Sequence, residues 1–315
     1  MIALFLIIVL VQACVSSKKA EPKAKNYTMF KTRKAESSYL RAYNNTLALW
    51  PIAYEAVNIK TSFGTAHIII SGPKNGDPLV LLHGMNASST MWYPNIDALA
   101  DKHRVYAIDF ILEPGKSISN EKIKDKQKII EWYNEIFNHL KLEQISIVGA
   151  SRGGWLALHL AMDTTNRIKN IVLLSPAQSF NFIKLKRKMR SNVYFFLFPK
   201  RKRLRKSLQT FSSNADKIKA LYIDQYYIAS EKSKKNLSLL QMTPFPNEKL
   251  KSLKMPVLLL IGDKDIINDQ KSIVKAQEFI SNIETDIIQN SGHFLNMDQS
   301  EIVNKRILDF LKKNK

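Results

Sequence analysis

The chain alternates short, wholly apolar runs with longer segments in which apolar residues recur at helical spacing. Apolar runs of this length are typical of buried parallel strands, because a strand covered on both faces has no polar side. The periodic segments between them predict amphipathic helices. We expect strands at 78–82, 104–109, 145–148, 170–176, 256–263 and 284–289, and helices at 38–49, 92–100, 121–142, 155–162, 270–280 and 300–312.

The order of these elements predicts an α/β fold. Val57–Thr61 and Ala66–Ile70 flank the turn Ser62-Phe63-Gly64, which indicates an antiparallel hairpin at one sheet edge. The later strands alternate with helices, which favours a mostly parallel sheet with helices on both faces. The segment 177–254 breaks this alternation, because it contains helical patterns and no convincing strand. We interpret it as a helical lid over the strand ends, where ligands bind in open α/β sheets.

The stretch around Ser151 carries the strongest chemical signal. The apolar run 145–148 is followed at once by Gly149-Ala-Ser151-Arg-Gly153 and then by an apolar helix. Strand, G-x-S-x-G and helix form a nucleophile elbow, in which the serine occupies a very tight turn and the flanking positions need glycine. The start of the helix would favour an anionic intermediate there. The alternative is a chance Gly/Ser-rich turn.

With its other motifs, the sequence resembles the α/β-hydrolase superfamily, close to bacterial carboxylesterase-like members, from about Val57 to the C-terminus. The resemblance rests on these motifs in the family's order: His83-Gly84, Asp109 with Gly115 and Ser117, the elbow, Gly262-Asp-Lys-Asp265 and Ser291-Gly-His293. It implies an α/β-hydrolase fold and a catalytic serine, acid and histidine in that order. Haloalkane dehalogenases and epoxide hydrolases of the same fold use an aspartate nucleophile. The serine at position 151 therefore excludes these two classes of enzyme here.

The resemblance implies a triad of Ser151, Asp265 and His293. A serine needs a base within hydrogen-bond reach and a group that holds the base in the right tautomer. His293 follows the last strand in a Ser-Gly-His loop, and the family's Gly-x-x-Asp spacing selects Asp265 as the acid. Asp263 and Asp269 are the alternative candidates for the acid. We expect Asp263 instead to be a turn residue that caps its own backbone, and Asp269 to be a helix N-cap.

The oxyanion hole should use the backbone N–H groups of Met85 and Arg152. His83 would then shape the loop that carries Met85 rather than act as a base, and the Arg152 side chain would add positive charge near the site. The sequence has neither a His/Asp/Glu cluster with metal-ligand spacing nor a G-x-G-x-x-G after a strand. We therefore expect no cofactor and no metal.

The residues favour a serine esterase that cleaves a small-molecule carboxylic ester. A lipase-like or thioester-cleaving enzyme is the alternative within the same chemistry, since 195–198 contains three phenylalanines that would suit a lid for long acyl chains or its core. A non-catalytic binding protein at the cell surface is the alternative from another class, because fold alone does not give function.

The net charge of the chain and the clustering of its basic residues bear on its partners. The formal net charge is +21, yet no nucleic-acid-binding signature accompanies it, so we expect no nucleic-acid partner. The segments 184–190 and 200–206 hold eleven Lys and Arg, and no acid occurs from 178 to 214. A basic lid of this kind suits an anionic membrane surface. The alternative is a solvated surface in a lysine-rich protein.

The N-terminal residues predict export. Ile2–Val11 is an apolar run that suits a signal peptide, and Val-Gln-Ala-Cys14 resembles a bacterial lipobox with Cys14 as the lipidated residue. We expect a lipoprotein-like segment at 1–14, a flexible tether at 15–35 and one hydrolase domain at 36–315. The expected location is that of an exported, membrane-anchored bacterial lipoprotein. Another export or anchor segment and a cytoplasmic location are the alternatives.

Overall fold

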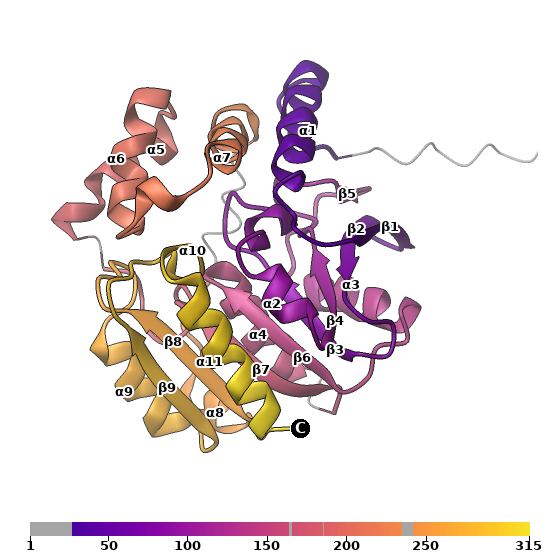
Figure 1. Cartoon of the computed structure of the whole chain (residues 1–315), viewed down its shortest axis with the longest axis vertical. Coiled ribbons are helices and arrows are strands. Elements are labelled where there is room, and N and C mark those ends of the chain that lie inside the picture. The colour runs from indigo at the N-terminus through magenta and orange to yellow at the C-terminus, as the bar shows by residue number, and fades with distance from the viewer. Residues whose placement is uncertain (1–26, 164–165, 185, 235–241) are drawn as a thin grey trace, which may run out of the picture.

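In the computed structural model, one sheet organises the chain (Figure 1). The structure describes residues 27–163, 166–184, 186–234 and 242–315. Nine strands lie in this part of the chain: β1 Tyr54–Thr61, β2 Gly64–Ser71, β3 Asp77–Leu82, β4 His103–Ile108, β5 Ile118–Ser119, β6 Ile145–Ala150, β7 Ile168–Leu174, β8 Val257–Gly262 and β9 Ile283–Ile288. The lipoprotein-like segment 1–14 with Cys14 lies outside the described residues, as does most of the expected tether.

The strand order is β1-β2-β4-β3-β6-β7-β8-β9, with β5 paired to β2. The pairs β1/β2, β2/β4 and β2/β5 are antiparallel, and every pair from β4 to β9 is parallel. The expected hairpin therefore forms one edge of the sheet. Strands β6 and β8 are buried along their whole length, as their apolar runs predicted.

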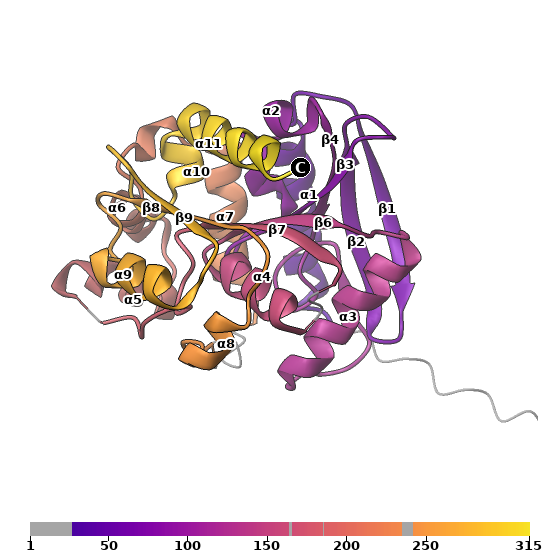
Figure 2. The same cartoon turned by 90° about the horizontal axis from the view of Figure 1, so that it is seen from below.

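Helices cover both faces, as Figure 2 shows. One apolar core packs under α3 Lys126–His139, α4 Arg152–Asp163, α8 Asn247–Lys251 and α9 Gln270–Phe279. The other packs under α1 Arg33–Leu47, the 3-10 turn η1 Ser89–Trp92, α2 Ile96–Ala100, α10 Leu295–Asp298 and α11 Ser300–Lys313. The predicted fold class, a mostly parallel sheet between two helical layers, is confirmed. No helix of the described residues is long and apolar enough to span a bilayer.

One predicted helix starts too early. The apolar spacing suggested a helix over 121–142, but α3 begins at Lys126 because the Asp125 side chain accepts a hydrogen bond from the Gln127 N–H and caps it. Just upstream, Ile118–Ser119 pairs with β2. The predicted start of the helix at 121 was therefore wrong. The prediction also missed β5, because a strand of two residues is too short to show a period.

The first helix starts earlier than its apolar spacing suggested. Helix α1 begins at Arg33, and the Thr32 side chain accepts from the Ala35 N–H as its N-cap. Still further upstream, Phe30 is buried and forms a β-bridge with Ser233. The packed part of the chain therefore includes residues that precede the expected boundary near Glu36.

The segment between β7 and β8 is helical. It contains the 3-10 turns η2 Arg187–Met189 and η3 Ala215–Lys217 and the helices α5 Arg190–Leu197, α6 Arg201–Phe211 and α7 Ala220–Lys232. We call residues 177–254 the insertion. Its helices α5 to α7 lie beyond the carboxyl ends of the strands in Figure 1. Phe195, Leu204, Leu208 and Tyr226 form a small apolar cluster of their own there.

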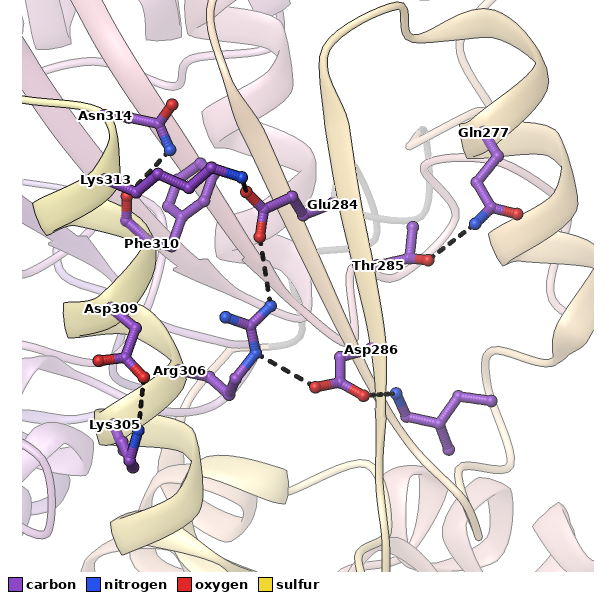
Figure 3. A network of polar contacts seen from close by, with 11 residues as sticks. Gln277, Glu284, Thr285, Asp286, Lys305, Arg306, Asp309, Phe310, Lys313 and Asn314 are labelled. Atoms are coloured by element: carbon purple, nitrogen blue, oxygen red, sulfur yellow. Dashed lines mark hydrogen bonds and ion pairs between the residues drawn. The ribbon is translucent and has the colours of Figure 1, made fainter.

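Ion pairs fix the last strand to the last helix (Figure 3). Arg306 on α11 pairs with Asp286 at 3.1 Å, and Lys313 pairs with Glu284 at 2.8 Å. Strand β9 ends the sheet, and an uncovered edge invites pairing with another chain. Charged side chains along β9 make such pairing unfavourable.

Candidate active site

Ser151 lies on a strained turn between β6 and α4. Its φ is +53°, a left-handed conformation that non-glycine residues rarely adopt. A Cβ at Gly149 would approach the Gly153 carbonyl oxygen to 2.3 Å, and a Cβ at Gly153 would approach the Leu82 oxygen to 2.0 Å. Neither position accepts a larger residue without backbone movement. The local geometry of the predicted elbow, with two required glycines, is therefore present.

Ser151, His293 and Asp265 lie in one hydrogen-bonded line. The Ser151 Oγ is 2.9 Å from the His293 Nε2, and the His293 Nδ1 is 3.1 and 3.3 Å from the two Asp265 oxygens. The three residues come from the ends of β6, β8 and β9, which are separate in sequence. The structure thus brings together the three residues that the sequence suggested.

The Asp265 carboxylate is buried and fully engaged. Besides His293, it accepts hydrogen bonds from the Ile267 N–H at 2.8 Å and the Asn268 side-chain amide at 3.0 Å. Burial alone would raise the pKa of Asp265, but His293 and these two donors together hold it below its ordinary value. The carboxylate is therefore ionised, and it orients the His293 ring with its Nδ1 protonated.

Asp263 has a different role from the one expected. Its Oδ1 accepts from the Ser291 N–H at 2.9 Å, so it does not cap its own turn. Ser291 lies two residues before His293, and Asp263 thereby ties the loop after β8 to the loop after β9. The prediction of a self-capping turn was wrong, because the partner comes from a distant loop. Asp269 does cap α9 as expected, accepting from the Lys271 N–H.

The two expected oxyanion-hole donors border the serine. Met85 follows Gly84, where an added Cβ would lie 3.5 Å from the Ser151 Cβ, and Arg152 is the first residue of α4. Within the described part of the chain, neither the Met85 nor the Arg152 N–H donates a hydrogen bond to the protein. Unengaged donors at a helix start can stabilise a developing oxyanion.

The expectation that the Arg152 side chain adds positive charge to the site was wrong. It is buried and forms an ion pair with Glu113, so its charge is neutralised instead of being offered to the site. The guanidinium also donates to the Gly84 carbonyl at 3.2 Å and lies 4.6 Å from the Phe110 ring centre. Burial lowers the pKa of Arg152 to about 9, which still leaves it protonated at neutral pH.

His83 is held by backbone groups on both ring nitrogens. Its Nε2 accepts from the Phe110 N–H at 2.9 Å, and its Nδ1 lies 2.9 Å from the Gly84 carbonyl, to which it donates. Burial, and then the nearby Arg152 charge, lower the pKa of His83 to about 4. The ring is neutral at ordinary pH and shapes the loop before Met85, as the sequence suggested.

Two acidic residues near the site escaped the sequence analysis. Glu113 pairs with Arg152 and accepts from the Asn86 N–H at 3.0 Å. Asp298 accepts from the Gly292 N–H at 2.7 Å and from the Ser213 N–H at 2.9 Å, joining the His293 loop to the insertion. Neither residue belongs to a local motif, because the partners of Glu113 and the Ser213 partner of Asp298 are distant along the chain.

The insertion reaches the candidate site at Phe211. This last residue of α6 has its ring centre 5.5 Å from that of His293, and its carbonyl accepts from the Phe294 N–H at 3.0 Å. A Cβ at Gly292 would approach the Phe211 oxygen to 2.4 Å. The insertion therefore forms one wall beside the base. Among the described residues, no group of three or more His, Cys, Asp or Glu is placed to hold a metal ion.

Comparisons with known proteins agree with this architecture. The family described as the alpha/beta hydrolase fold matches residues 77–300. An uncharacterized carboxylesterase Nap of Bacillus subtilis is 31% identical over 86% of this chain and 91% of its own length. The carboxylesterase YbfK of the same organism is 32% identical over 87% and 93%.

A solved structure gives the same result in three dimensions. The crystal structure of naproxen esterase (carboxylesterase NP) from Bacillus subtilis superposes with a TM-score of 0.82 at 30% identity. It covers 89% of this chain and 99% of that protein. With the sheet order, the strained serine turn and these matches, the chain belongs to the α/β-hydrolase family.

Proposed function

We propose that the protein is a carboxylic ester hydrolase that works through an acyl-Ser151 intermediate. The carrying observation is the line from the Ser151 Oγ to the His293 Nε2 at 2.9 Å and on to Asp265. The carboxylesterase names of relatives at 31% and 32% identity support the same reaction class.

In the first half-reaction, the Ser151 Oγ attacks the ester carbonyl carbon while His293 Nε2 takes the hydroxyl proton. The carbonyl oxygen becomes an oxyanion, which accepts hydrogen bonds from the backbone N–H groups of Met85 and Arg152. The carbon–oxygen bond to the alcohol then breaks, and His293 returns its proton to the leaving oxygen. Asp265 keeps the ring oriented and stabilises its transient positive charge.

In the second half-reaction, water repeats the sequence on the acyl-enzyme. His293 takes a proton from the water as its oxygen attacks the acyl carbon, and the oxyanion forms again between the same two N–H groups. The bond to the Ser151 Oγ then breaks, and His293 returns the proton to that oxygen. The products are the carboxylic acid and the regenerated serine.

The experiment is ester hydrolysis combined with active-site labelling. The full-length protein should hydrolyse p-nitrophenyl esters of short acyl chains, and a fluorophosphonate should attach to Ser151, as peptide mapping would show. Ser151→Ala should lower kcat by about 10³-fold or more and abolish labelling. Labelling at another serine would contradict the assignment, and an inert but folded protein would favour the non-catalytic binding role.

A series of longer acyl chains and thioesters separates the two enzymatic alternatives. A rise of kcat/KM with acyl length would favour the lipase-like enzyme. Faster cleavage of a thioester than of the matching ester would favour the thioesterase.

We further propose that the chain is exported and lipidated at Cys14. The support is the apolar run Ile2–Val11 followed by Cys14, the only cysteine of the sequence. Expression with a radiolabelled fatty acid tests this in bacteria. Label in the wild type and none in Cys14→Ser is the expected result. Unlabelled protein in the cytosolic fraction would contradict it.

A further inference from the structure

We propose that the turn between α5 and α6 docks on an anionic lipid bilayer. We call residues 193–206 the α5–α6 tip. The inference goes beyond ester hydrolysis, and it does not require lipidation of Cys14, because it rests on side chains that the insertion exposes.

The α5–α6 tip exposes a group of large apolar side chains of the kind that water-soluble proteins ordinarily bury. Val193, Tyr194, Leu197 and Phe198 are 40 to 55% exposed, and the rings of Tyr194 and Phe198 lie 5.5 Å apart. They belong to α5 and to the residue that follows it. A contiguous apolar group of this kind marks an interaction surface, and amphipathic aromatic rings are favoured at the boundary between water and lipid.

Basic side chains border this apolar group. Lys200, Lys202, Arg205 and Lys206 are exposed, and within the described residues none of them pairs with an acid. Arg201, paired with Asp224, is the exception among the basic residues of the tip. A rim in which most of the basic residues are unpaired complements anionic headgroups, and each basic residue at such a surface strengthens binding severalfold.

One arginine joins the apolar and basic parts. The Arg203 guanidinium lies 4.1 Å from the Tyr194 ring centre and donates to the Phe198 carbonyl at 2.7 Å. The cation is thereby fixed directly beside the exposed rings. This arrangement fits a headgroup and its acyl chain side by side, with the guanidinium at the phosphate and the rings just below it.

The tip belongs to a part of the insertion that stands apart from the sheet. It rests on α7 through the stacked rings of Phe195 and Tyr226, and α5 to α7 stand apart from the sheet in Figure 1. The Lys31 N–H donates to the Lys232 carbonyl at the end of α7. The described chain thus begins at β5, where the Tyr27 N–H donates to the Ser119 carbonyl, and then passes the end of α7.

Lipid suits the α5–α6 tip better than single-stranded nucleic acid does. Both ligands are anionic and both accept aromatic contacts. However, nucleic-acid bases bind such a surface by stacking on its aromatic rings. The aliphatic Val193 and Leu197 beside Phe198 contribute binding energy only when they are buried in an apolar phase. The observations thus favour a bilayer surface, and a nucleic acid becomes an outcome of the test.

Vesicle sedimentation of the full chain with Cys14→Ser tests the proposal. Vesicles of phosphatidylcholine alone are compared with vesicles that also contain phosphatidylglycerol, at low and high salt. The tip variant replaces Lys200, Lys202, Arg205 and Lys206 by Gln. The control variant replaces Lys74, Lys102, Lys141 and Lys254 by Gln, removing the same charge from exposed positions before β3, β4, β6 and β8.

We expect the tip variant to bind anionic vesicles on the order of tenfold more weakly, and the control variant to stay near the parent. Tyr194→Ser with Phe198→Ser should reduce the binding that persists at high salt. Equal losses in tip and control variants would overturn the proposal, because net charge alone would then explain the attraction. Tighter binding to a polyuridine oligonucleotide than to vesicles, lost in the tip variant, would overturn it in favour of nucleic acid.

Discussion

Arg152 and Glu113 form a buried ion pair that connects the nucleophile turn to the loop carrying Met85. Arg152 also donates to the Gly84 carbonyl, and Glu113 also accepts from the Asn86 N–H. The residues on both sides of Met85 are thus held by one pair, and we expect that pair to fix the distance between the Met85 and Arg152 N–H groups, the two proposed oxyanion-hole donors.

Breaking this pair should damage both stability and turnover. Glu113→Gln leaves the Arg152 charge buried without a counterion, which costs about 3–5 kcal/mol of unfolding free energy. Because the oxyanion develops only in the transition state, kcat should fall while KM changes little. Denaturant unfolding and ester kinetics measure the two effects. Glu121→Gln, which removes the solvent-exposed pair with Lys128, is the control and should leave the unfolding free energy almost unchanged, because exposed ion pairs contribute little. Equal effects of both variants would refute the positioning role.

The two aspartates after β8 should separate cleanly. Asp265→Asn should lower kcat by about 10³- to 10⁴-fold, because the amide favours the wrong His293 tautomer. Asp263→Asn keeps an oxygen for the Ser291 N–H and should cost under about tenfold. If Asp263→Asn proves slower than Asp265→Asn, the acid is misassigned.

His293→Ala combined with Ser151→Ala should be no slower than either single variant, because nucleophile and base act as a unit.

His83 should make stability depend on pH below neutrality. Burial lowers its pKa from 6.5 to about 4, so between these values the unfolded chain binds a proton that the folded chain refuses. The free energy of unfolding should therefore fall by about 3 kcal/mol as the pH drops from 6.5 to 4. His83→Gln should flatten this slope. Part of it should remain, because burial also lowers the pKa values of the buried His67 and His103 and of the partly buried His159. His139→Gln, at an exposed site, is the control for denaturant titrations at each pH.

Gln225 should anchor the insertion to the fold. This buried α7 residue donates to the Tyr39 Oη at 3.0 Å and to the Ser88 Oγ at 2.8 Å, and accepts from the Thr90 Oγ1 at 2.8 Å. Gln225→Leu removes these three hydrogen bonds, although Tyr39 keeps its bond to the Pro114 carbonyl and Ser88 and Thr90 keep the bond between them. The loss should cost about 1–3 kcal/mol of unfolding free energy. Gln277→Leu removes an exposed amide that donates to Thr285 (Figure 3) and should cost under about 0.5 kcal/mol. Similar melting temperatures for both variants would contradict the anchor.

Local patterns were sufficient for every strand except β5 and for the turn that carries Ser151. Apolar runs locate buried strands, and the glycines around Ser151 are required by contacts within a few residues of the turn or with the adjacent strand. Glu113, Asp298 and Gln225 could not be found in this way, because Arg152, Ser213 and Thr90, which they contact, lie on distant segments. The same cause explains the error at Arg152, whose charge is neutralised by a residue that no local motif identifies.

The contact between Phe211 and Gly292 limits how the enzyme could be re-engineered. Since the Phe211 carbonyl occupies the space that a side chain at position 292 would need, the insertion and the base-carrying loop fit as complementary shapes. A lid grafted from a relative would have to reproduce this backbone approach, or His293 would shift away from Ser151. Substrate range should therefore be redesigned by exchanging side chains within the existing insertion, because replacing the insertion as a module would displace the base.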